Sequence, residues 1–475
     1  MITDHASLSP FMQRVRKVHF VGVAGVGMSG IAEVMNTIGY EVSGSDLSEG
    51  PVTEKLKAAG IRIFKGHAAE NISDVDVVVT SSAIPADNPE IRVARARMIP
   101  VVPRAEMLAE LMRFSNGIAV AGTHGKTTTT SLIASVLAEG GLDPTYVIGG
   151  KLNSSASNAK LGSGQYLVAE ADESDASFLF LQPMLAVVTN VDADHLSTYG
   201  GDFDRLRNAF VEFLHHLPFY GLAIVCVDDE NARKLLPQIT RQVIRYGIEQ
   251  DADICASNIS TSGLQSTFDV MLPDHDAPLH ITLNLPGRHN ILNALAAIAV
   301  AFELGVDRAA IKTALKNFAG IGRRMQMYGD IETAAGTITM VDDYGHHPTE
   351  VAATLEAVRC SWPERRLVVV FQPHRYSRTH DLFEDFTAVL ADVDVLLVSE
   401  VYAAGEQPIT GADSRSLCAA IRQRGKVNPI FVEDIEEVEK ELVSILQDGD
   451  VLLTLGAGSI GRVASELPQK LREAS

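Results

Sequence analysis

Short apolar runs alternate with helix-like segments along most of this 475-residue chain, and glycine-rich turns join some of the runs to the helices that follow. Runs such as VHFVGV, DVDVVVTSSAI and GIAVAG contain few polar residues, as buried strands do. Buried strands that alternate with helices are typical of parallel sheets covered by helices. The pattern therefore predicts an α/β protein with parallel sheets.

The alternation divides the chain into three α/β units. The first ends near Pro103, after the short strand IPVVP and before the helix AEMLAELM. The second runs from GIAVAG through QYLVAEAD and MLAVVTNVD to the helix after LPGRHN, near Gly320. The third begins at GIGRRMQ and contains the strands TITMVDDY, RLVVVFQP, DVLLVSEV and DVLLTLGAG. We predict a Rossmann-like domain at 1–103, a central P-loop ATPase-like domain at 104–322 and a Rossmann-like domain at 323–475.

Net charge and cysteine usage exclude several classes of protein. The formal net charge is −20, whereas nucleic acid and anionic membranes bind positive surfaces. The four cysteines are scattered without a C-x-x-C pair, which is typical of a reducing compartment and argues against structural zinc. No stretch reaches the length of a membrane span. We expect no nucleic-acid partner, no membrane insertion and a cytoplasmic location.

The first glycine-rich turn has the pattern of a diphosphate site. Gly25, Gly27 and Gly30 match G-x-G-x-x-G at the start of a helix predicted from about Met28 to Ile38. Asp46 follows the next strand at the spacing of a ribose-binding acid. Glycines and a helix N-terminus suit any diphosphate, not only NAD. The pattern predicts diphosphate binding, with an NAD-dependent dehydrogenase or a turn that only packs as alternatives.

A second copy of this pattern has a different interpretation. Gly456, Gly458 and Gly461 also match it, after the strand DVLLTL. Too few residues follow for the second strand and acid of a dinucleotide site. We interpret this copy as a tight turn that packs a strand against a helix.

The segment GTHGKTTT resembles a P-loop in a shortened form. The first glycine of G-x-x-x-x-G-K-[ST] would fall at Val120, so Gly122 starts a G-x-x-G-K-T loop. Backbone N–H groups of such a loop cradle phosphates, with Lys126 on the β- and γ-oxygens and Thr127 on Mg²⁺. The segment predicts binding of a nucleoside triphosphate.

Acidic clusters follow the next two predicted strands. LVAEADESD ends with Glu170, Asp172 and Glu173 close together, and TNVDADHLSTYG contains Asp194 and His195. The carboxyl ends of parallel strands meet at one sheet edge, so both clusters should face the P-loop. Oxygen and imidazole ligands suit Mg²⁺ that also holds phosphates. A solvated or helix-capping role is the alternative for each acid taken singly.

Two asparagines follow in GRHNILNALAA. Asn290 and Asn293 lie three residues apart, on one face of the predicted helix. Their amides suit the edges of an adenine ring, and a helix-capping role for Asn290 is the alternative.

Taken together, these stretches resemble the Mur ligase family, the ATP-dependent amide-forming enzymes of peptidoglycan assembly. The pattern consists of GTHGKTTT, AEADESD, TNVDADHLSTYGG, GRHN, GRRMQ, DDYGHHPTE and FQPHRYSRT, in this order. DDYGHHPTE and FQPHRYSRT favour the member that joins L-alanine to the lactoyl carboxylate of UDP-N-acetylmuramate. Another Mur-type ligase with a related UDP-muramoyl or muropeptide substrate is the alternative. The resemblance implies ATP and Mg²⁺ as cofactors and a monomer or homodimer.

The resemblance also implies roles for individual residues. The catalytic residues would be Lys126, His195, Arg324 and Asp343. The ATP-binding residues would be Gly122, Thr123, His124, Gly125, Lys126, Thr127, Thr128, His289, Asn290, Asn293, Arg324 and Asp343. The substrate-binding residues would be Gly25, Val26, Gly27, Asp46, Ser82, Tyr344, His346, His374, Arg375 and Arg378. The metal ligands would be Thr127, Glu170 and His195.

The chain differs in one respect from the family that it resembles. Family members that add later residues carry a carbamylated lysine near a second Mg²⁺, but no lysine occurs here between Asp192 and Lys234. Two residues, His195 and His346, are candidates for the group that deprotonates the amine of the incoming amino acid. A dehydrogenase or a P-loop motor would each leave one of the two glycine-rich loops unused.

Overall fold

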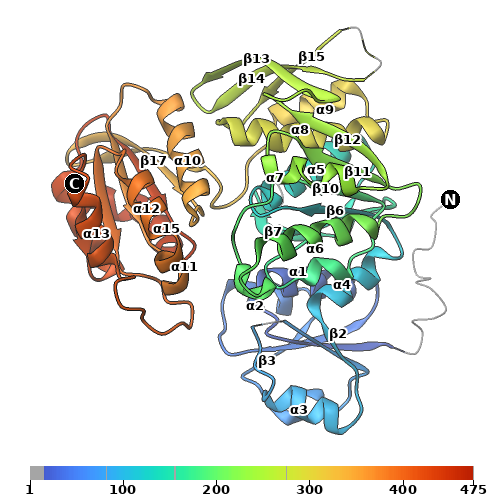
Figure 1. The fold of residues 1–475 in the computed structure, drawn as a ribbon. Helices are drawn as coiled ribbons and strands as arrows, with labels where there is room; N and C mark the ends of the chain where they lie inside the picture. Colours follow the sequence, from blue (N-terminus) through green and yellow to red (C-terminus); the bar gives the residue numbers. More distant parts are fainter. Residues whose placement is uncertain (1–14, 82, 154–156, 274, 276, 474–475) are drawn as a thin grey trace. The chain divides into compact units, whose positions relative to one another are not determined.

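The computed structural model describes residues 15–81, 83–153, 157–273, 275 and 277–473. Its strands form three separate sheets, each covered by helices (Figure 1). Packing groups the first two sheets into one compact unit, to which the described residues of 15–259, 268–282 and 292–318 belong, and the third sheet into a second unit. The predicted class, three α/β domains with parallel sheets, is confirmed.

The first sheet has the strand order β3-β2-β1-β4-β5, and every pair in it is parallel. This is the Rossmann order, with its switch point between β1 and β4. Its strands are β1 (Lys17–Val21), β2 (Glu41–Asp46), β3 (Arg62–Lys65), β4 (Val77–Thr80) and β5 (Val101–Pro103). Its helices are α1 (Val26–Thr37), α2 (Pro51–Ala58) and α3 (Pro89–Ala96).

The central sheet has the order β15-β14-β13-β12-β11-β10-β6-β9-β7-β8. Pairs from β7 to β13 are parallel, and β8 pairs antiparallel with β7 at one edge. Its strands are β6 (Asn116–Ala121), β7 (Thr145–Leu152), β8 (Ser157–Lys160), β9 (Tyr166–Glu170), β10 (Leu185–Val188), β11 (Leu222–Cys226), β12 (Gln242–Gly247), β13 (Ile254–Ser262), β14 (Gln265–Met271) and β15 (Leu279–Leu283). Helices in this part are α4 (Arg104–Met112), α5 (Lys126–Glu139), α6 (Phe203–His215), α7 (Glu230–Arg233), α8 (Arg288–Glu303) and α9 (Arg308–Lys316).

The third sheet has the order β16-β17-β21-β18-β19-β20, parallel except for the pair β16–β17. Its strands are β16 (Gln326–Thr333), β17 (Gly336–Asp343), β18 (Leu367–Phe371), β19 (Val395–Ser399), β20 (Ile430–Val432) and β21 (Val451–Leu455). The helices are α10 (Pro348–Ser361), α11 (Tyr376–Asp381), α12 (Phe383–Leu390), α13 (Ser414–Gln423), α14 (Val438–Ile445) and α15 (Ile460–Glu473). The four strands predicted for this unit correspond to β17, β18, β19 and β21.

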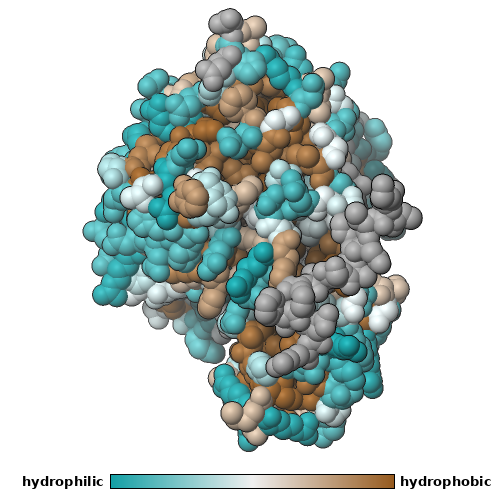
Figure 2. Space-filling view, turned by 90° about the vertical axis from the view of Figure 1, so that its right-hand side faces the viewer, coloured by the Kyte–Doolittle hydropathy of each residue, from teal (hydrophilic) through white to brown (hydrophobic). Residues whose placement is uncertain are grey.

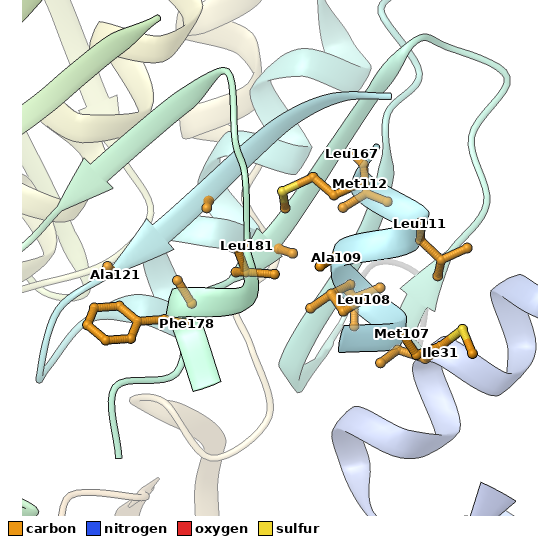
Figure 3. Packing of buried hydrophobic residues seen from close by; sticks show 14 of the residues in the cluster. Ile31, Met107, Leu108, Ala109, Leu111, Met112, Ala121, Leu167, Phe178 and Leu181 are labelled. Carbon is orange, nitrogen blue, oxygen red and sulfur yellow. The ribbon is translucent and has the colours of Figure 1, made fainter. Parts of the chain in front are cut away.

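Helix α4 joins the core of the first sheet to that of the central sheet. Met107 of α4 lies beside Ile31 of α1, and Met112 lies beside Leu167 of β9 (Figure 3). These side chains belong to one continuous cluster of buried residues, which also contains Phe178. The first two α/β parts therefore share a hydrophobic core, and the elements that follow β1 and β6 are fixed in one body.

The protein surface mixes polar and apolar residues. Figure 2 shows both kinds interspersed on one face of the molecule. Among the described residues, no helix combines the length and the apolar character that crossing a bilayer requires.

A buried carboxylate ties the elements of the first sheet together. Glu90, at the start of α3, has no exposed surface. Its carboxylate accepts hydrogen bonds from Ser45 Oγ (2.7 Å) and Asn71 Nδ2 (2.6 Å) and lies 3.0 Å from His67 Nδ1 and 3.5 Å from His19 Nε2. Burial alone would raise the pKa of Glu90, but His19, Ser45 and Asn71 lower it to about 2.

We expect Glu90→Gln to lower the free energy of unfolding of the part that contains the first sheet by about 3 kcal/mol, because the amide would place N–H donors against the donors of its neighbours. A carboxyl with a lowered pKa stabilises the fold above its ordinary pKa of 4.5 and loses this effect as the pH falls towards 2. Between pH 4.5 and pH 2, the melting temperature of the wild type should therefore fall more than that of the variant. Glu54→Gln, at an exposed position, is the control and should melt like the wild type.

Candidate active site

The predicted P-loop, between β6 and α5, forms the centre of the candidate site. Residues Gly122–Gly125 turn the chain from the carboxyl end of β6 into α5. Gly122 (φ +138°) and Gly125 (φ +81°) adopt backbone conformations that disfavour a side chain. A Cβ on Gly122 would lie 2.0 Å from Thr189 Oγ1, and one on Gly125 would lie 2.6 Å from Asn293 Oδ1. Backbone conformation and close neighbours both require glycine here.

The strand order brings the two acidic clusters to either side of this loop. β6 lies between β9 and β10, and the three strands are parallel. Glu170 ends β9, and Thr189 directly follows β10. Both clusters thus follow strands that neighbour β6, as the sequence predicts.

The segment after β10 holds the loop in place. Asn190 Oδ1 accepts a hydrogen bond from the backbone N–H of His124 (2.8 Å), and Thr189 Oγ1 donates to the carbonyl of His124 (2.6 Å). Asp192 donates its N–H to Thr123 Oγ1 (2.9 Å) and places its carboxylate 3.2 Å from His124 Nε2. The N–H of His124 is thus engaged, whereas the first N–H groups of α5 have no partner inside the helix and suit a phosphate.

Lys126 is bound inside the loop by an ion pair. Its Nζ donates to the carbonyls of Gly122 (2.5 Å) and Thr123 (3.0 Å) and to both carboxylate oxygens of Glu173 (3.0 and 2.8 Å). Burial alone would lower the pKa of Lys126, but the charges of Glu173, Asp172 and Glu170 raise it. The lysine is therefore a fixed positive charge at the predicted phosphate position.

The acids after β9 have unequal environments. Burial raises the pKa of Glu173 to about 7, with Asp172 adding to the rise and Lys126 opposing it. Burial would also raise the pKa of Asp172, but Lys126, Ser174 and Arg104 lower it. Asp172 therefore carries a negative charge at neutral pH, whereas the neighbouring carboxyl group of Glu173 takes up a proton near neutral pH.

The three predicted metal ligands come from the helix after β6 and from the ends of its two neighbouring strands: Thr127 lies on α5, Glu170 ends β9, and His195 follows β10. Thr127 is in the first turn of α5 and buried, and the carboxylate of Glu170 accepts the N–H of Gly149 (2.5 Å). His195 has a left-handed backbone (φ +56°) and places Nε2 3.3 Å from Asp194 Oδ2. Carboxylate, hydroxyl and imidazole donors of this kind suit Mg²⁺.

The two predicted adenine-binding amides are buried in the fold. Asn293 Oδ1 accepts a hydrogen bond from Thr129 Oγ1 of α5 (3.1 Å), which fixes this amide behind the P-loop. Asn290 Nδ2 donates to the carbonyl of Pro286 (2.8 Å) and so closes the turn before α8. Burial lowers the pKa of His289 to about 4. Helix capping by Asn290 and adenine binding by these residues both stay predictions.

The first glycine-rich turn lies at the carboxyl end of β1, beside the switch point of the first sheet. α1 begins at Val26, two residues before its predicted start, with Gly25 as N-cap. Asp46 Oδ2 accepts the N–H of Ala24 (3.0 Å) and thereby braces the turn. A Cβ on Gly27 would meet the guanidinium of Arg104, 3.0 Å from Nη1. Ser82 and the side chain of Val26 lie outside the described residues.

In the part of the chain that contains the third sheet, two arginines stack on one tyrosine. The guanidinium carbons of Arg323 and Arg324 lie 5.1 and 4.9 Å from the ring centre of Tyr344. Arg323 Nε also pairs with Asp342 Oδ2 (3.1 Å). The buried carboxylate of Asp343 accepts N–H groups of the neighbouring backbone, and burial raises its pKa while Arg324 opposes the rise. This places the predicted Arg324, Asp343 and Tyr344 in one cluster after β17.

The remaining predicted substrate residues form a second cluster in this unit. The rings of His346 and His374 lie 5.6 Å apart, and His374 stacks on Tyr402 at 5.5 Å. Arg378, which is nearly buried, places Nη1 3.4 Å from His374 Nδ1. Burial lowers the pKa of His346 to about 3 and that of His374 to about 4, so both rings are neutral at neutral pH.

Arg375 is the N-cap residue of α11 and has a positive φ. Its φ is +71°, and its N–H donates to the carbonyl of Tyr402 (2.8 Å). This contact fixes the start of the PHRYSR segment next to the loop after β19.

The second copy of the glycine pattern packs against the protein itself. A Cβ on Gly456 would lie 2.6 Å from the carbonyl of Gln372, and one on Gly461 would lie 2.2 Å from Arg323. Gln372 also fills the turn and accepts the N–H of Ile460 (2.9 Å). The prediction of a packing turn is confirmed.

Several residues of these clusters are not predicted from the sequence as site residues. Arg323 shares the GRRM segment with Arg324, and Glu350 ends DDYGHHPTE, so their motifs offered a signal. Arg104 and Tyr402 lie outside every motif, and only the fold brings them to a site. Glu173 is part of AEADESD, but its pairing with Lys126 follows from the structure alone.

Family models match three consecutive parts of the chain. "Mur ligase family, catalytic domain" matches residues 17–116, "Mur ligase middle domain" matches 120–301, and "Mur ligase, glutamate ligase domain" matches 323–458. These three matches follow the three sheets in order.

Solved structures of this family are similar over most of the chain. The UDP-N-acetylmuramate–alanine ligase of Thermotoga maritima is 32% identical, with a TM-score of 0.82 over 97% of this chain and 100% of that one. The murein peptide ligase of Psychrobacter arcticus is 25% identical, with a TM-score of 0.70 over 96% and 99%. The UDP-N-acetylmuramate:L-alanyl-γ-D-glutamyl-meso-diaminopimelate ligase of Neisseria meningitides is 28% identical, with a TM-score of 0.60 over 65% and 100%. The chain belongs to the Mur ligase family and is an ATP-dependent, ADP-forming amide ligase of peptidoglycan synthesis.

Proposed function

We propose that the protein joins L-alanine to the lactoyl carboxylate of UDP-N-acetylmuramate. The observation that carries this proposal is the pair of phosphate-binding loops, after β1 and after β6, in one compact unit. One loop suits the diphosphate of a UDP-sugar and the other the triphosphate of ATP. The choice of L-alanine is supported by the 32% identity with the alanine ligase, against 25% and 28% with the two peptide ligases. We assign 1–103 to the UDP-sugar, 104–322 to ATP, and 323–475 to the amino acid and ATP.

The proposed reaction first activates the carboxylate. A lactoyl carboxylate oxygen bonds to the γ-phosphorus of ATP as the bond to ADP breaks, which gives an acyl phosphate. The amine of alanine then attacks the carbonyl carbon, loses a proton, and expels phosphate. Lys126 supplies charge at the transferring phosphoryl group. The positive charges of Arg375 and Arg378 suit the carboxylates of the two substrates.

His195 and His346 are the two candidates for the group that accepts the amine proton, and burial lowers the pKa of His346 to about 3, which weakens it as a base. His346 Nδ1 faces two acceptors, Glu350 Oε2 (3.2 Å) and the carbonyl of Tyr344 (3.1 Å). Nδ1 therefore carries the hydrogen, and Nε2 keeps its lone pair for a proton. His195 is proposed as a metal ligand, which would occupy its lone pair.

Mg²⁺ would be held by Thr127, Glu170 and His195, where it neutralises charge on the transferring phosphoryl group. Because carboxylate and hydroxyl oxygens dominate this set, we expect Mg²⁺ or Mn²⁺ to support turnover. Metal analysis of the purified protein is the check. Zinc present in stoichiometric amount after chelation would contradict this ligand assignment.

We expect Gly27→Val to raise the KM for UDP-N-acetylmuramate about tenfold or more, because the side chain blocks approach to the loop and displaces Arg104. The KM for ATP should stay near the wild-type value, and steady-state kinetics on both substrates measures the difference. Gly50→Val is the control, since a Cβ there meets nothing within 4 Å. A rise in the ATP constant alone would show that the two loops are assigned in reverse.

A ligase that adds a preformed peptide is the second candidate, favoured by the likeness to the two peptide ligases. The test compares kcat/KM for L-alanine with kcat/KM for the tripeptide L-alanyl-γ-D-glutamyl-meso-diaminopimelate, with product mass as readout. The proposed function predicts a large preference for L-alanine. A preference for the tripeptide would replace it with the second candidate.

A further inference from the structure

The segment after β10 makes a short helical turn that touches the segment after β9. The turn is Leu196–Tyr199, and it begins directly after His195. Thr198 Oγ1 donates to the carbonyl of Ser174 (2.6 Å), and Tyr199 Oη donates to a second carbonyl of the same segment. Because β9 and β10 lie on opposite sides of β6, these bonds join the two segments that flank the P-loop.

The hydroxyl of Tyr199 is a buried donor in a fixed place. The residue is 8% exposed, and its ring belongs to the cluster of buried residues that also contains Phe178 and Phe210. Its Oη donates to the carbonyl of Glu173 (2.6 Å). Burial and the charge of Glu173 raise the pKa of Tyr199, so the hydroxyl keeps its proton at neutral pH. Packing therefore holds the ring and aims the donor at this carbonyl.

The residue that accepts this bond also holds the lysine of the P-loop. Glu173 is 1% exposed, and both of its carboxylate oxygens accept hydrogen bonds from Lys126 Nζ. It lies between the end of β9 and a short 3₁₀ turn at Ser177–Phe180, so its backbone lies beyond the end of the sheet. Its carbonyl also accepts the N–H of Ala176 (3.1 Å), which is a local bond. The bond from Tyr199 ties Glu173 to a different part of the fold.

We propose that Tyr199 is a positioning residue of the ATP site, whose hydroxyl places Glu173 so that its carboxylate holds Lys126 at the phosphate position. The inference rests on the role that the proposed function gives to Lys126. A buried ion pair depends on the placement of both partners, and a charge contributes most to phosphoryl transfer when it is held in place beforehand. Without the hydroxyl, Glu173 keeps its local bond but loses its tie to the segment after β10.

The test compares Tyr199→Phe with the wild type in the full-length protein, because phenylalanine keeps the ring and removes only the hydroxyl. Calorimetry should show MgATP binding weakened about five- to tenfold, and kcat/KM for ATP should fall by a similar factor. Affinity for UDP-N-acetylmuramate should stay within about twofold, since its proposed site is at the other loop. Tyr166→Phe removes the hydroxyl of another nearly buried tyrosine, on β9. This matched control should bind MgATP like the wild type.

A double-mutant cycle with Glu173→Gln tests whether Tyr199 acts through this carboxylate. Glu173→Gln keeps the shape of the side chain and removes its charge from Lys126. When Tyr199→Phe is added to Glu173→Gln, the affinity for MgATP should change by less than about twofold, because the charge to be placed is already gone. Losses that add in full would show that Tyr199 acts elsewhere and would overturn the inference.

Two other results would also overturn it. One is MgATP binding by Tyr199→Phe at wild-type strength or tighter. The other is an equal loss of affinity for MgATP and for UDP-N-acetylmuramate together with a lower melting temperature, which would show that the hydroxyl only stabilises the fold. A wild type that binds MgATP but not UDP-N-acetylmuramate would overturn the proposed function, whereas the MgATP affinities and the cycle would still decide the role of Tyr199.

Discussion

Lys126→Ala is expected to lower the rate of ligation by about 10²–10³-fold, which corresponds to about 3–4 kcal/mol of transition-state stabilisation. The substitution removes the fixed charge that the loop carbonyls and Glu173 hold at the phosphate position. The fold should survive, because Glu173 already has a pKa of about 7 and takes up a proton once its partner is gone. Phosphate release and circular dichroism measure the two effects.

Lys160→Ala is the matched control for this prediction. Lys160 forms an exposed ion pair with Asp143 in the same compact unit. Its removal should leave the rate of ligation unchanged. Ligation by Lys126→Ala within about threefold of the wild-type rate would contradict the role assigned to the lysine, since such a ratio is under 1 kcal/mol.

Gly122→Ala is expected to abolish ATP binding and to lower the melting temperature. A methyl group there would lie 2.0 Å from Thr189 Oγ1 and 3.1 Å from the backbone of Asn190. Either the loop or the segment after β10 must move, and the hydrogen bond from Thr189 to the carbonyl of His124 breaks. Calorimetric titration with ATP and thermal melting measure the two losses.

Gly60→Ala is the control that separates the clash of a new methyl group with its neighbours from the cost of a positive φ in a residue with a side chain. Gly60 also has a positive φ (+87°), but a Cβ there meets nothing within 4 Å. It should cost only the left-handed backbone penalty, about 1–2 kcal/mol, and leave ATP affinity intact. ATP binding by Gly122→Ala at wild-type strength would show that the loop tolerates the shift and that its shape is not set by Thr189.

The strand–loop–helix units could be predicted from sequence because their signals are local. β6, the P-loop and α5 are contiguous, and an apolar run with a following glycine turn suffices to predict them. Strands β11 to β15 are not predicted individually: β11 is a buried apolar run that the division into units passes over, whereas β12 to β15 form one edge of the central sheet and much of β13 is exposed. Apolar runs predict buried strands and fail at such an edge.

The site could be predicted from sequence only as far as its motifs extend. Positions such as Lys126, Glu170 and His195 stand in contiguous segments with recognisable chemistry. Arg104 lies in none of them and reaches Gly27 only because α4 packs on α1. Pairings of this kind depend on tertiary packing, which local sequence does not encode residue by residue.

The prediction for Asp46 illustrates the same limit. The spacing from the first glycine turn indicates a ribose-binding acid, and the structure adds that its carboxylate accepts the N–H of Ala24. A side chain that braces its own loop and one that binds a ligand have the same sequence pattern. The ribose contact of Asp46 therefore stays a prediction.

The central claim, ligation through an acyl phosphate, is tested most directly by following a labelled oxygen. UDP-N-acetylmuramate with oxygen-18 in both positions of its lactoyl carboxylate is incubated with ATP, Mg²⁺, L-alanine and the protein, and the released phosphate is analysed by mass spectrometry. The account predicts one labelled oxygen in each phosphate released, and no release when either L-alanine or the UDP-sugar is omitted. Unlabelled phosphate, or ATP turnover that does not require both substrates, would contradict it.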